Sequence, residues 1–174
     1  MKIKLLFFIL CYFCIISVHI PSQAKNNSQI LQRNIGNWIT YIEKKGKKKI
    51  CYMYSNPIKT IIFTEKRDTP YINLNYLGEN NFTITVKPGF EISQNNPILI
   101  IIDEERKYNL NSKYKNFATT YNSDQDNHII NLFIKATYNY FTIKSYKTDD
   151  KLALDYYSLS GFKDSLKYLK NNCS

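Results

Sequence analysis

Most of the chain beyond residue 37 alternates apolar and polar positions with a period of two, which is the pattern of half-buried β-strands. Turn residues such as Gly46 and the pair Asn56-Pro57 separate the alternating segments. The pattern predicts eight strands, over residues 38–43, 50–54, 72–76, 82–86, 98–102, 106–110, 138–146 and 152–159. The period lengthens to that of a helix in two places, after Asp124 and after Ser160.

Short strands joined by hairpin turns, with two short helices and no strand–helix alternation, predict an all-β sandwich. The length of the chain suits one domain, which we expect to span residues 37–174. Residues 25–36 are mostly polar, and we expect them to form a flexible leader ahead of this domain.

The first 24 residues have the features of a secretory signal peptide. Lys2 and Lys4 give a basic start, residues 5–18 are almost entirely apolar, and Ala24 ends a stretch with the small residues that a signal peptidase accepts. The apolar run is shorter than the roughly 20 residues that a membrane-spanning helix needs. We therefore expect cleavage after Ala24; the alternative is an N-terminal anchor that stays on the protein.

The chain has 24 Lys and Arg residues against 14 Asp and Glu residues. Residues 1–24 contain two of the lysines and no acid, so the mature chain keeps 22 basic and 14 acidic residues, a net charge of +8. It contains no second apolar run of membrane-spanning length, and we expect no transmembrane segment in it.

Five lysines crowd the first predicted hairpin turn: Lys44, Lys45, Lys47, Lys48 and Lys49. One interpretation is a contact with an anionic envelope surface, such as lipid headgroups, lipopolysaccharide or a host polyanion. The other is a hairpin tip that charge keeps soluble. Nucleic acid is not an expected partner, because export removes the chain from the cytoplasm and no recognition motif is present.

Two cysteines remain after removal of the signal, Cys51 and Cys173. In an exported protein two cysteines most simply form one disulfide, here closing a loop of about 120 residues. The alternative is a pair of free thiols.

Candidate catalytic and metal-binding residues are few. His128 is the one histidine of the mature chain and has no catalytic motif around it, so a surface or capping role is expected. One histidine and two paired cysteines are too few for a zinc or copper site, and neither a metal nor another cofactor is predicted. The acids at 103–105 and 149–150 fall in predicted turns, where solvated carboxylates are expected rather than an acid–base pair.

Several short motifs resemble the invasion-associated locus B family of Gram-negative bacteria, over about residues 38–173. They are Trp38-Ile39-Thr40-Tyr41, Lys49-Ile50-Cys51-Tyr52-Met53, Arg67-Asp68-Thr69-Pro70-Tyr71 and Tyr157-Ser158-Leu159-Ser160-Gly161-Phe162, followed by Leu166 and Cys173. The resemblance implies an immunoglobulin-like β-sandwich, with Cys51 and Cys173 as a structural pair and with Trp38 and Phe162 in the core.

The same resemblance implies a small exported protein of the periplasm or outer membrane, without enzymatic activity, in a family whose founding members are linked to host-cell invasion. We expect a binding or support role toward an envelope or host protein. Three alternatives remain open: a surface adhesin that contacts host cells directly, an envelope enzyme of unrecognised class, and a chaperone-like envelope factor.

Overall fold

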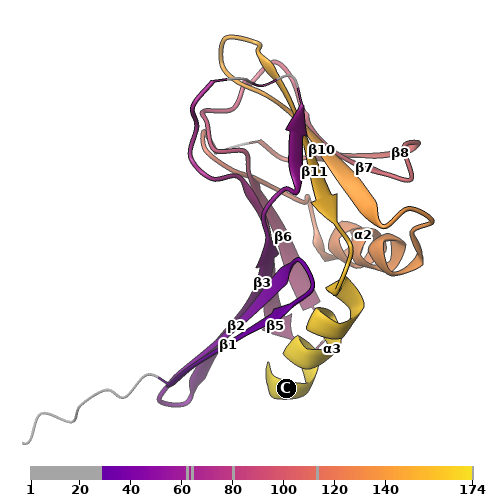
Figure 1. The fold of residues 1–174 in the computed structure, drawn as a ribbon. Coiled ribbons are helices and arrows are strands. Elements are labelled where there is room, and N and C mark those ends of the chain that lie inside the picture. The colour runs from indigo at the N-terminus through magenta and orange to yellow at the C-terminus, as the bar shows by residue number, and fades with distance from the viewer. Residues whose placement is uncertain (1–28, 62, 64, 80, 113, 174) are drawn as a thin grey trace, which may run out of the picture.

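The computed structural model describes residues 29–61, 63, 65–79, 81–112 and 114–173. The predicted signal peptide therefore lies outside the described residues. Two antiparallel sheets form the fold (Figure 1). One sheet has the strand order β1-β2-β3-β5-β6-β9, and the other has the order β4-β11-β10-β7-β8.

The first sheet, called sheet A here, consists of β1 (Gln29–Ile35), β2 (Trp38–Lys45), β3 (Lys48–Ser55), β5 (Tyr71–Gly78), β6 (Asn81–Lys87) and β9 (Ala118–Thr119). The second, sheet B, consists of β4 (Lys59–Ile61), β7 (Ile98–Ile102), β8 (Arg106–Leu110), β10 (Tyr140–Tyr146) and β11 (Leu152–Ser158). Neighbouring strands pair residue by residue with the apolar side chains on the inner faces, as the period of two requires. The predicted all-β sandwich is confirmed.

Two helices cover parts of the inner faces that the opposite sheet leaves open. Helix α2 (Ser123–Lys135) packs on β6, and α3 (Phe162–Cys173) packs on β2 and β3 (Figure 1). The side chain of Asn122 accepts a hydrogen bond from the Gln125 backbone amide (2.9 Å), which caps α2. Buried residues recur along one face of each helix, as the predicted helical periods required.

The structure corrects one expectation about the N-terminal part of the chain. Residues 29–35 are not a flexible leader: they form β1, which pairs with β2 along its whole length, from Gln29 opposite Lys44 to Ile35 opposite Trp38. The sequence pattern did not predict β1, because most of its side chains are polar. An edge strand buries few side chains, and it pairs with its neighbour through the backbone. Strands β4 and β9 were missed because they contain three and two residues.

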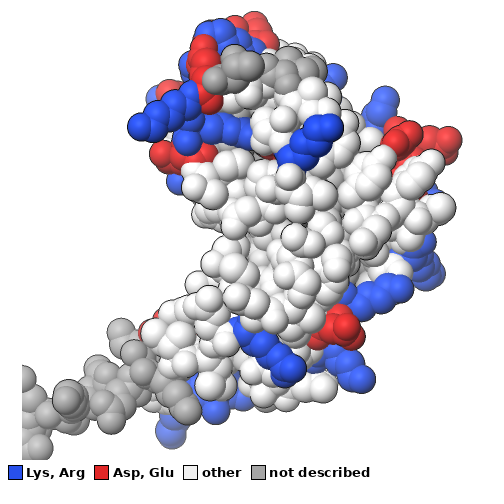
Figure 2. Space-filling model, in the orientation of Figure 1, with Lys and Arg blue, Asp and Glu red and all other residues white. Residues whose placement is uncertain are grey.

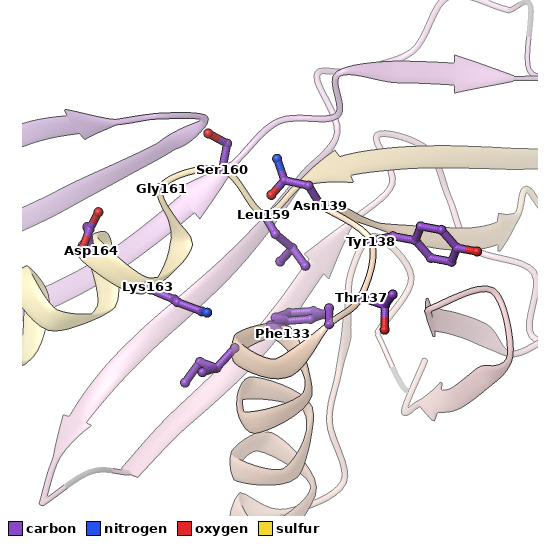
Figure 3. A pocket seen from close by; sticks show the side chains of 11 residues that line it. Phe133, Thr137, Tyr138, Asn139, Leu159, Ser160, Gly161, Lys163 and Asp164 are labelled. Carbon is purple, nitrogen blue, oxygen red and sulfur yellow. The ribbon is translucent and has the colours of Figure 1, made fainter.

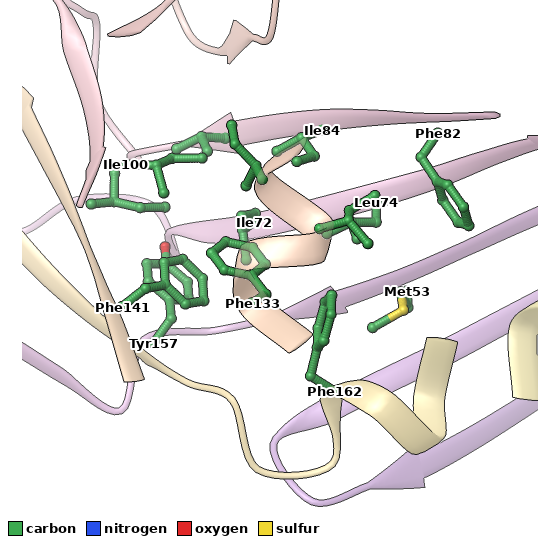
Figure 4. Close-up of a cluster of buried hydrophobic side chains, with 14 of the residues drawn as sticks. Met53, Ile72, Leu74, Phe82, Ile84, Ile100, Phe133, Phe141, Tyr157 and Phe162 are labelled. Carbon is green, nitrogen blue, oxygen red and sulfur yellow. The ribbon is translucent and has the colours of Figure 1, made fainter. Parts of the chain in front are cut away.

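One continuous core joins both sheets and both helices. The aromatic rings of Phe133, Phe141 and Tyr157 stack between the layers, with centroids 4.3 Å and 5.3 Å apart (Figure 4). Phe162, at the start of α3, packs edge-on against Phe133 and also against Trp38, whose ring centroid lies 5.0 Å away. Trp38 and Phe162 are buried, so their expected place in the core is confirmed.

A close crossing of two backbone turns fixes α3 on sheet A. Gly36 and Gly161 both have positive φ (58° and 82°), and a Cβ on Gly161 would lie 2.0 Å from the carbonyl oxygen of Ile35. The indole Nε1 of Trp38 donates to the carbonyl of Ser158 (3.0 Å), and the amide of Asn37 donates to the carbonyl of Ser160 (3.0 Å). The first and last motifs of the resemblance therefore meet at this crossing.

Candidate functional site

The lysine-rich turn projects from one end of sheet A. Lys44 and Lys49 are paired across the β2–β3 hairpin, as are Lys45 and Lys48, and Gly46 and Lys47 complete the turn. The side chains of 44, 47 and 48 are exposed, and none of the three makes an ion pair within the described residues. Lys49 donates to the carbonyl of Asn172 (3.2 Å), and the side chain of Lys45 is not described. We call this end, defined by Lys44, Lys47, Lys48 and Lys49, the lysine tip.

The disulfide holds the C-terminal helix against the lysine tip. Cys51 and Cys173 are bonded, with their Cα atoms 6.3 Å apart and a sequence separation of 122. Both the presence of two cysteines in an exported chain and the resemblance predicted this pair, and it is confirmed. Because Cys51 lies two residues after Lys49 in β3, the bond ties the hairpin to α3.

Charge is unevenly distributed over the molecular surface. Figure 2 shows Lys and Arg side chains around the end that carries the hairpin and α3, while the middle of the same face holds few charges. Lys167 and Lys170 of α3 add to the basic end, and Glu43 and Glu79 are acids near it. Basic side chains thus predominate at one end of the molecule.

Three aliphatic side chains are exposed at the same end. Ile30, Ile50 and Leu77 have exposed fractions of 50%, 51% and 68%. Leu77 lines an open hollow of about 530 Å³ together with Lys47, Lys49 and the two bonded cysteines. The tip therefore combines positive charge with unburied hydrocarbon.

Tyrosines gather on the outer face of sheet A. Tyr41 and Tyr52 stack with ring centroids 4.9 Å apart, and Tyr54 lies 6.2 Å from Tyr52. A shallow hollow between Tyr52, Tyr54, Tyr71 and Asn73 lies on this face. Partial burial and the neighbouring tyrosines raise the pKa of Tyr52. The face is aromatic and polar, whereas Tyr76 of the same sheet packs against the core.

The turn carboxylates stabilise loops rather than forming an acid–base pair. Asp103 accepts from the amides of Thr137 (2.9 Å) and Tyr138 (3.1 Å), and its side chain is only 11% exposed, less solvated than expected. Glu104 accepts from the Tyr140 hydroxyl (2.6 Å), and this hydrogen bond raises the pKa of Tyr140 to about 12.

The second acidic turn belongs to an exposed ion-pair network. Asp149 and Glu65 both contact Lys147 and Lys151, and these hydrogen bonds lower the pKa of Glu65. Asp150 accepts from Ser93 (3.1 Å) and Asn96 (2.9 Å) instead. Among the described residues, the carboxylates of the two turns contact the hydroxyls of Tyr140 and Ser93 and no histidine, so no histidine is placed to activate either hydroxyl.

His128 lies on the exposed side of α2, as expected. Its Nε2 is 3.0 Å from the hydroxyl of Tyr108, and the two rings meet edge to face. This contact joins α2 to β8. Among the described residues, no group of three or more His, Cys, Asp or Glu side chains could hold a metal ion.

Sequence reasoning missed a buried ion pair behind the predicted motif at 67–71. The guanidinium of Arg67 contacts both carboxylate oxygens of Asp155, and Arg67 also donates to the carbonyl of Pro88 (2.9 Å). Thr60 donates to Asp155 (2.6 Å) and completes the network. Tyr157 follows two residues later; burial and the Asp155 carboxylate raise its pKa. The only signal in the sequence was the aspartate inside the otherwise apolar pattern of the last strand.

A second buried carboxylate, Asp126, links α2 to sheet A. It accepts from the backbone amide of Ile84 (2.7 Å) and from the hydroxyl of Thr120. It is 3% exposed, and this burial raises its pKa. These contacts give Asp126 a role in docking α2 on sheet A.

A hollow between the two helices has the polar residues Ser160, Lys163 and Asp164 on its wall, opposite Phe133 (Figure 3). No hydrogen bond or ion pair joins these three polar side chains, so they do not form an activated nucleophile. The hollow is a gap at the helix junction. No helix in the described part of the chain is long and apolar enough to cross a membrane.

Comparison with solved structures finds a protein with a similar fold. The crystal structure of invasion associated protein b from Bartonella henselae has a similar fold, with a TM-score of 0.56 over 80% of this chain and 94% of that chain. The two sequences are 13% identical over this match. No family model and no curated protein matches the sequence.

The structural match confirms, for the fold, the resemblance that the motifs indicated. It extends over nearly all of the neighbour, so the two proteins share a complete fold rather than one sheet. At 13% identity the match establishes the architecture, and what this protein binds has to be argued from its own surface.

Proposed function

We propose that the protein is an exported component of the bacterial envelope that binds an anionic surface through its lysine tip and has no catalytic role. The N-terminal sequence, the disulfide and the fold of the Bartonella neighbour support export and an envelope location. The lysine tip supplies the binding surface, and it is the observation on which the proposal mainly rests.

The lysine tip suits a polyanion better than one small anion. Its lysines all belong to a single hairpin turn and the strand ends beside it, and the side chains of Lys44, Lys47 and Lys48 are exposed. No described acid neutralises these three side chains. Each lysine near an anionic membrane surface contributes about 1 kcal/mol, so several acting together give a useful affinity.

The disulfide adds rigidity to this contact. It fixes the base of the hairpin to α3, so the lysines are presented together without ordering a loose segment. The charge of the tip also steers the protein toward an anionic surface over a distance of about 8–10 Å at physiological salt.

The test compares charge-matched variants of the mature, oxidised protein. Lys44, Lys47 and Lys48 are replaced by Gln together, and the control replaces Lys59, Lys66 and Lys107, which are exposed elsewhere. Sedimentation is measured with phosphatidylglycerol-containing vesicles and with purified lipopolysaccharide. We expect salt-sensitive binding to at least one of them, reduced at least tenfold in the tip variant and little changed in the control. Equal effects of both variants, or no binding by the unaltered protein, would contradict the proposal.

The name of the structural neighbour favours a second candidate function, direct contact with host cells. This function requires the protein to be on the outside of the bacterium. Protease treatment of intact cells separates the two: degradation supports the host-contact function, and protection supports a periplasmic one.

A further inference from the structure

We propose that the lysine tip docks on an anionic lipid bilayer by inserting Ile30, Ile50 and Leu77 among the lipid headgroups. This inference rests on the proposed function, and it identifies the anionic surface that the protein binds as a lipid membrane. Lysines alone would bind any polyanion, whereas exposed aliphatic side chains gain free energy only where hydrocarbon is available.

The cross-strand register places two of these side chains in one row. Ile30 pairs with Glu43 in the β1–β2 ladder, and Glu43 pairs with Ile50 in the β2–β3 ladder. Residues directly opposite each other in antiparallel strands point to the same face of a sheet. Ile30 and Ile50 therefore flank Glu43 on the outer face, and each is about half exposed.

Leu77 extends the apolar surface on the neighbouring strand. Tyr76 pairs with Cys51, so Leu77 lies one position nearer the tip. It is the most exposed of the large apolar side chains in the described part of the chain, at 68%. Leu77 also lines the hollow with Lys47 and Lys49, beside the disulfide.

Charge complementarity selects an anionic bilayer as the occupant. Lys44, Lys47 and Lys48 lie beyond the apolar row, toward the turn, where they can meet lipid phosphates while the aliphatic side chains enter the layer. Glu43 lies in the row and opposes insertion, but the lysines outnumber it at the tip.

The path of the chain is consistent with the same orientation. Strand β1 begins at Gln29, opposite Lys44, so the sequence that precedes it joins the fold at the lysine tip. A retained apolar segment at 5–18, the alternative to cleavage, would tether this same end to a membrane. Both N-terminal alternatives are therefore compatible with a tip that faces the bilayer.

The experiment separates insertion from simple charge attraction. Ile50 and Leu77 are replaced by Ser together, and Ile58→Ser is the matched control, because Ile58 is 57% exposed but lies outside the tip. Binding is measured to vesicles of phosphatidylcholine with one-third phosphatidylglycerol, and to soluble polyphosphate, which has negative charge but no hydrocarbon. We expect the Ile50/Leu77 variant to lose at least tenfold in vesicle affinity and to bind polyphosphate as the unaltered protein does.

A second measurement reports insertion directly. Trp38 is the only tryptophan and is buried, so a tryptophan introduced by Ile50→Trp reports on the tip. We expect its emission to shift to the blue on vesicles and to be quenched by brominated lipid. If the aliphatic variant and the lysine variant both bind vesicles like the unaltered protein, the inference and its bilayer partner are wrong. If only the lysine variant loses affinity and Ile50→Trp is not quenched, insertion is refuted while binding to an anionic surface stands.

Discussion

The guanidinium of Arg67 lies on the fully buried carboxylate of Asp155, a pair that joins the loop after β4 to the last strand of sheet B. The guanidinium also lies over the rings of Phe63 and Phe90, 5.1 Å and 5.6 Å from their centroids. Two aromatic rings and a carboxylate therefore surround one cation and exclude water from it, which explains why an arginine stands at this position.

Asp155→Asn is expected to destabilise the fold strongly. The substitution leaves the charge of Arg67 buried without its partner, and breaking such a pair costs about 3–5 kcal/mol. Urea unfolding measures the loss. Asp149→Asn, in the exposed network, is the control and should change stability little. A small effect of Asp155→Asn would mean that Arg67 reaches solvent.

Arg67→Lys is expected to cost nearly as much, because an ammonium cannot make the two-sided contact or stack on the rings. A double variant, Arg67→Met with Asp155→Leu, removes both charges together. It should be more stable than either single variant, and additive losses in the same urea assay would contradict coupling of the two side chains.

Reduction of the disulfide should lower stability by roughly 5 kcal/mol, the chain-entropy value for a loop of this length. The measurement compares urea unfolding of the oxidised protein with that of Cys51→Ser/Cys173→Ser. In the folded double variant the helix α3 should also show faster amide exchange, because the bond holds its end. Unchanged exchange in α3 would mean that packing alone fixes the helix.

Gly161→Ala is expected to destabilise by more than about 3 kcal/mol, beyond the usual cost of a single substitution. The new methyl group would overlap the carbonyl of Ile35, and neither backbone can retreat without losing the bond from Asn37 to Ser160. Gly46→Ala is the matched control: its φ is also positive (61°), but no atom lies near, so only the conformational cost of about 1 kcal/mol applies. Equal melting temperatures for the two variants would contradict a close contact between the backbones at Gly161 and Ile35.

The stability of the protein should depend on the protonation of Asp126. Burial raises the pKa of this carboxyl in the fold, so the fold favours its protonated form. Its contribution is therefore greatest at low pH and is lost as the pH rises through the folded pKa. Asp126→Asn keeps an acceptor for Ile84 and removes the charge.

We expect the stability of Asp126→Asn, relative to the unaltered protein, to increase from pH 3 to pH 7 in urea titrations. Asp124→Asn, exposed in the same helical turn, is the control. A trend that both variants share would assign the effect to the helix end instead of to burial.

The strands that bury one face were predictable, and those that bury little were not. The side chains of Ile72, Leu74 and Ile84 are buried in the core, which produces the alternation in β5 and β6. That alternation determines where the two strands lie in the sequence and how they pair. Strand β1 has no such pattern because only its backbone and part of one face are used. The number of strands was thus underestimated where pairing does not depend on side chains.

The site was partly predictable for a similar reason. The lysines and the cysteines are chemically distinctive in sequence, so the turn and the disulfide could be anticipated from residue type. The pairing of Arg67 with Asp155 depends on two segments 88 positions apart, and no local pattern encodes that distance. The cluster of Ile50 and Leu77 also required the register between β3 and β5.

The two ends of the described chain are attached to the fold with different mechanical strength. A load that pulls Gln29 away from the lysine tip would open the β1–β2 ladder one hydrogen-bonded pair at a time, starting opposite Lys44. A load on the C-terminal end meets the covalent bond at Cys173 first and passes directly into β3. Tension applied through the N-terminal side would therefore peel a single edge strand and leave the rest of the sheet and the stapled helix in place.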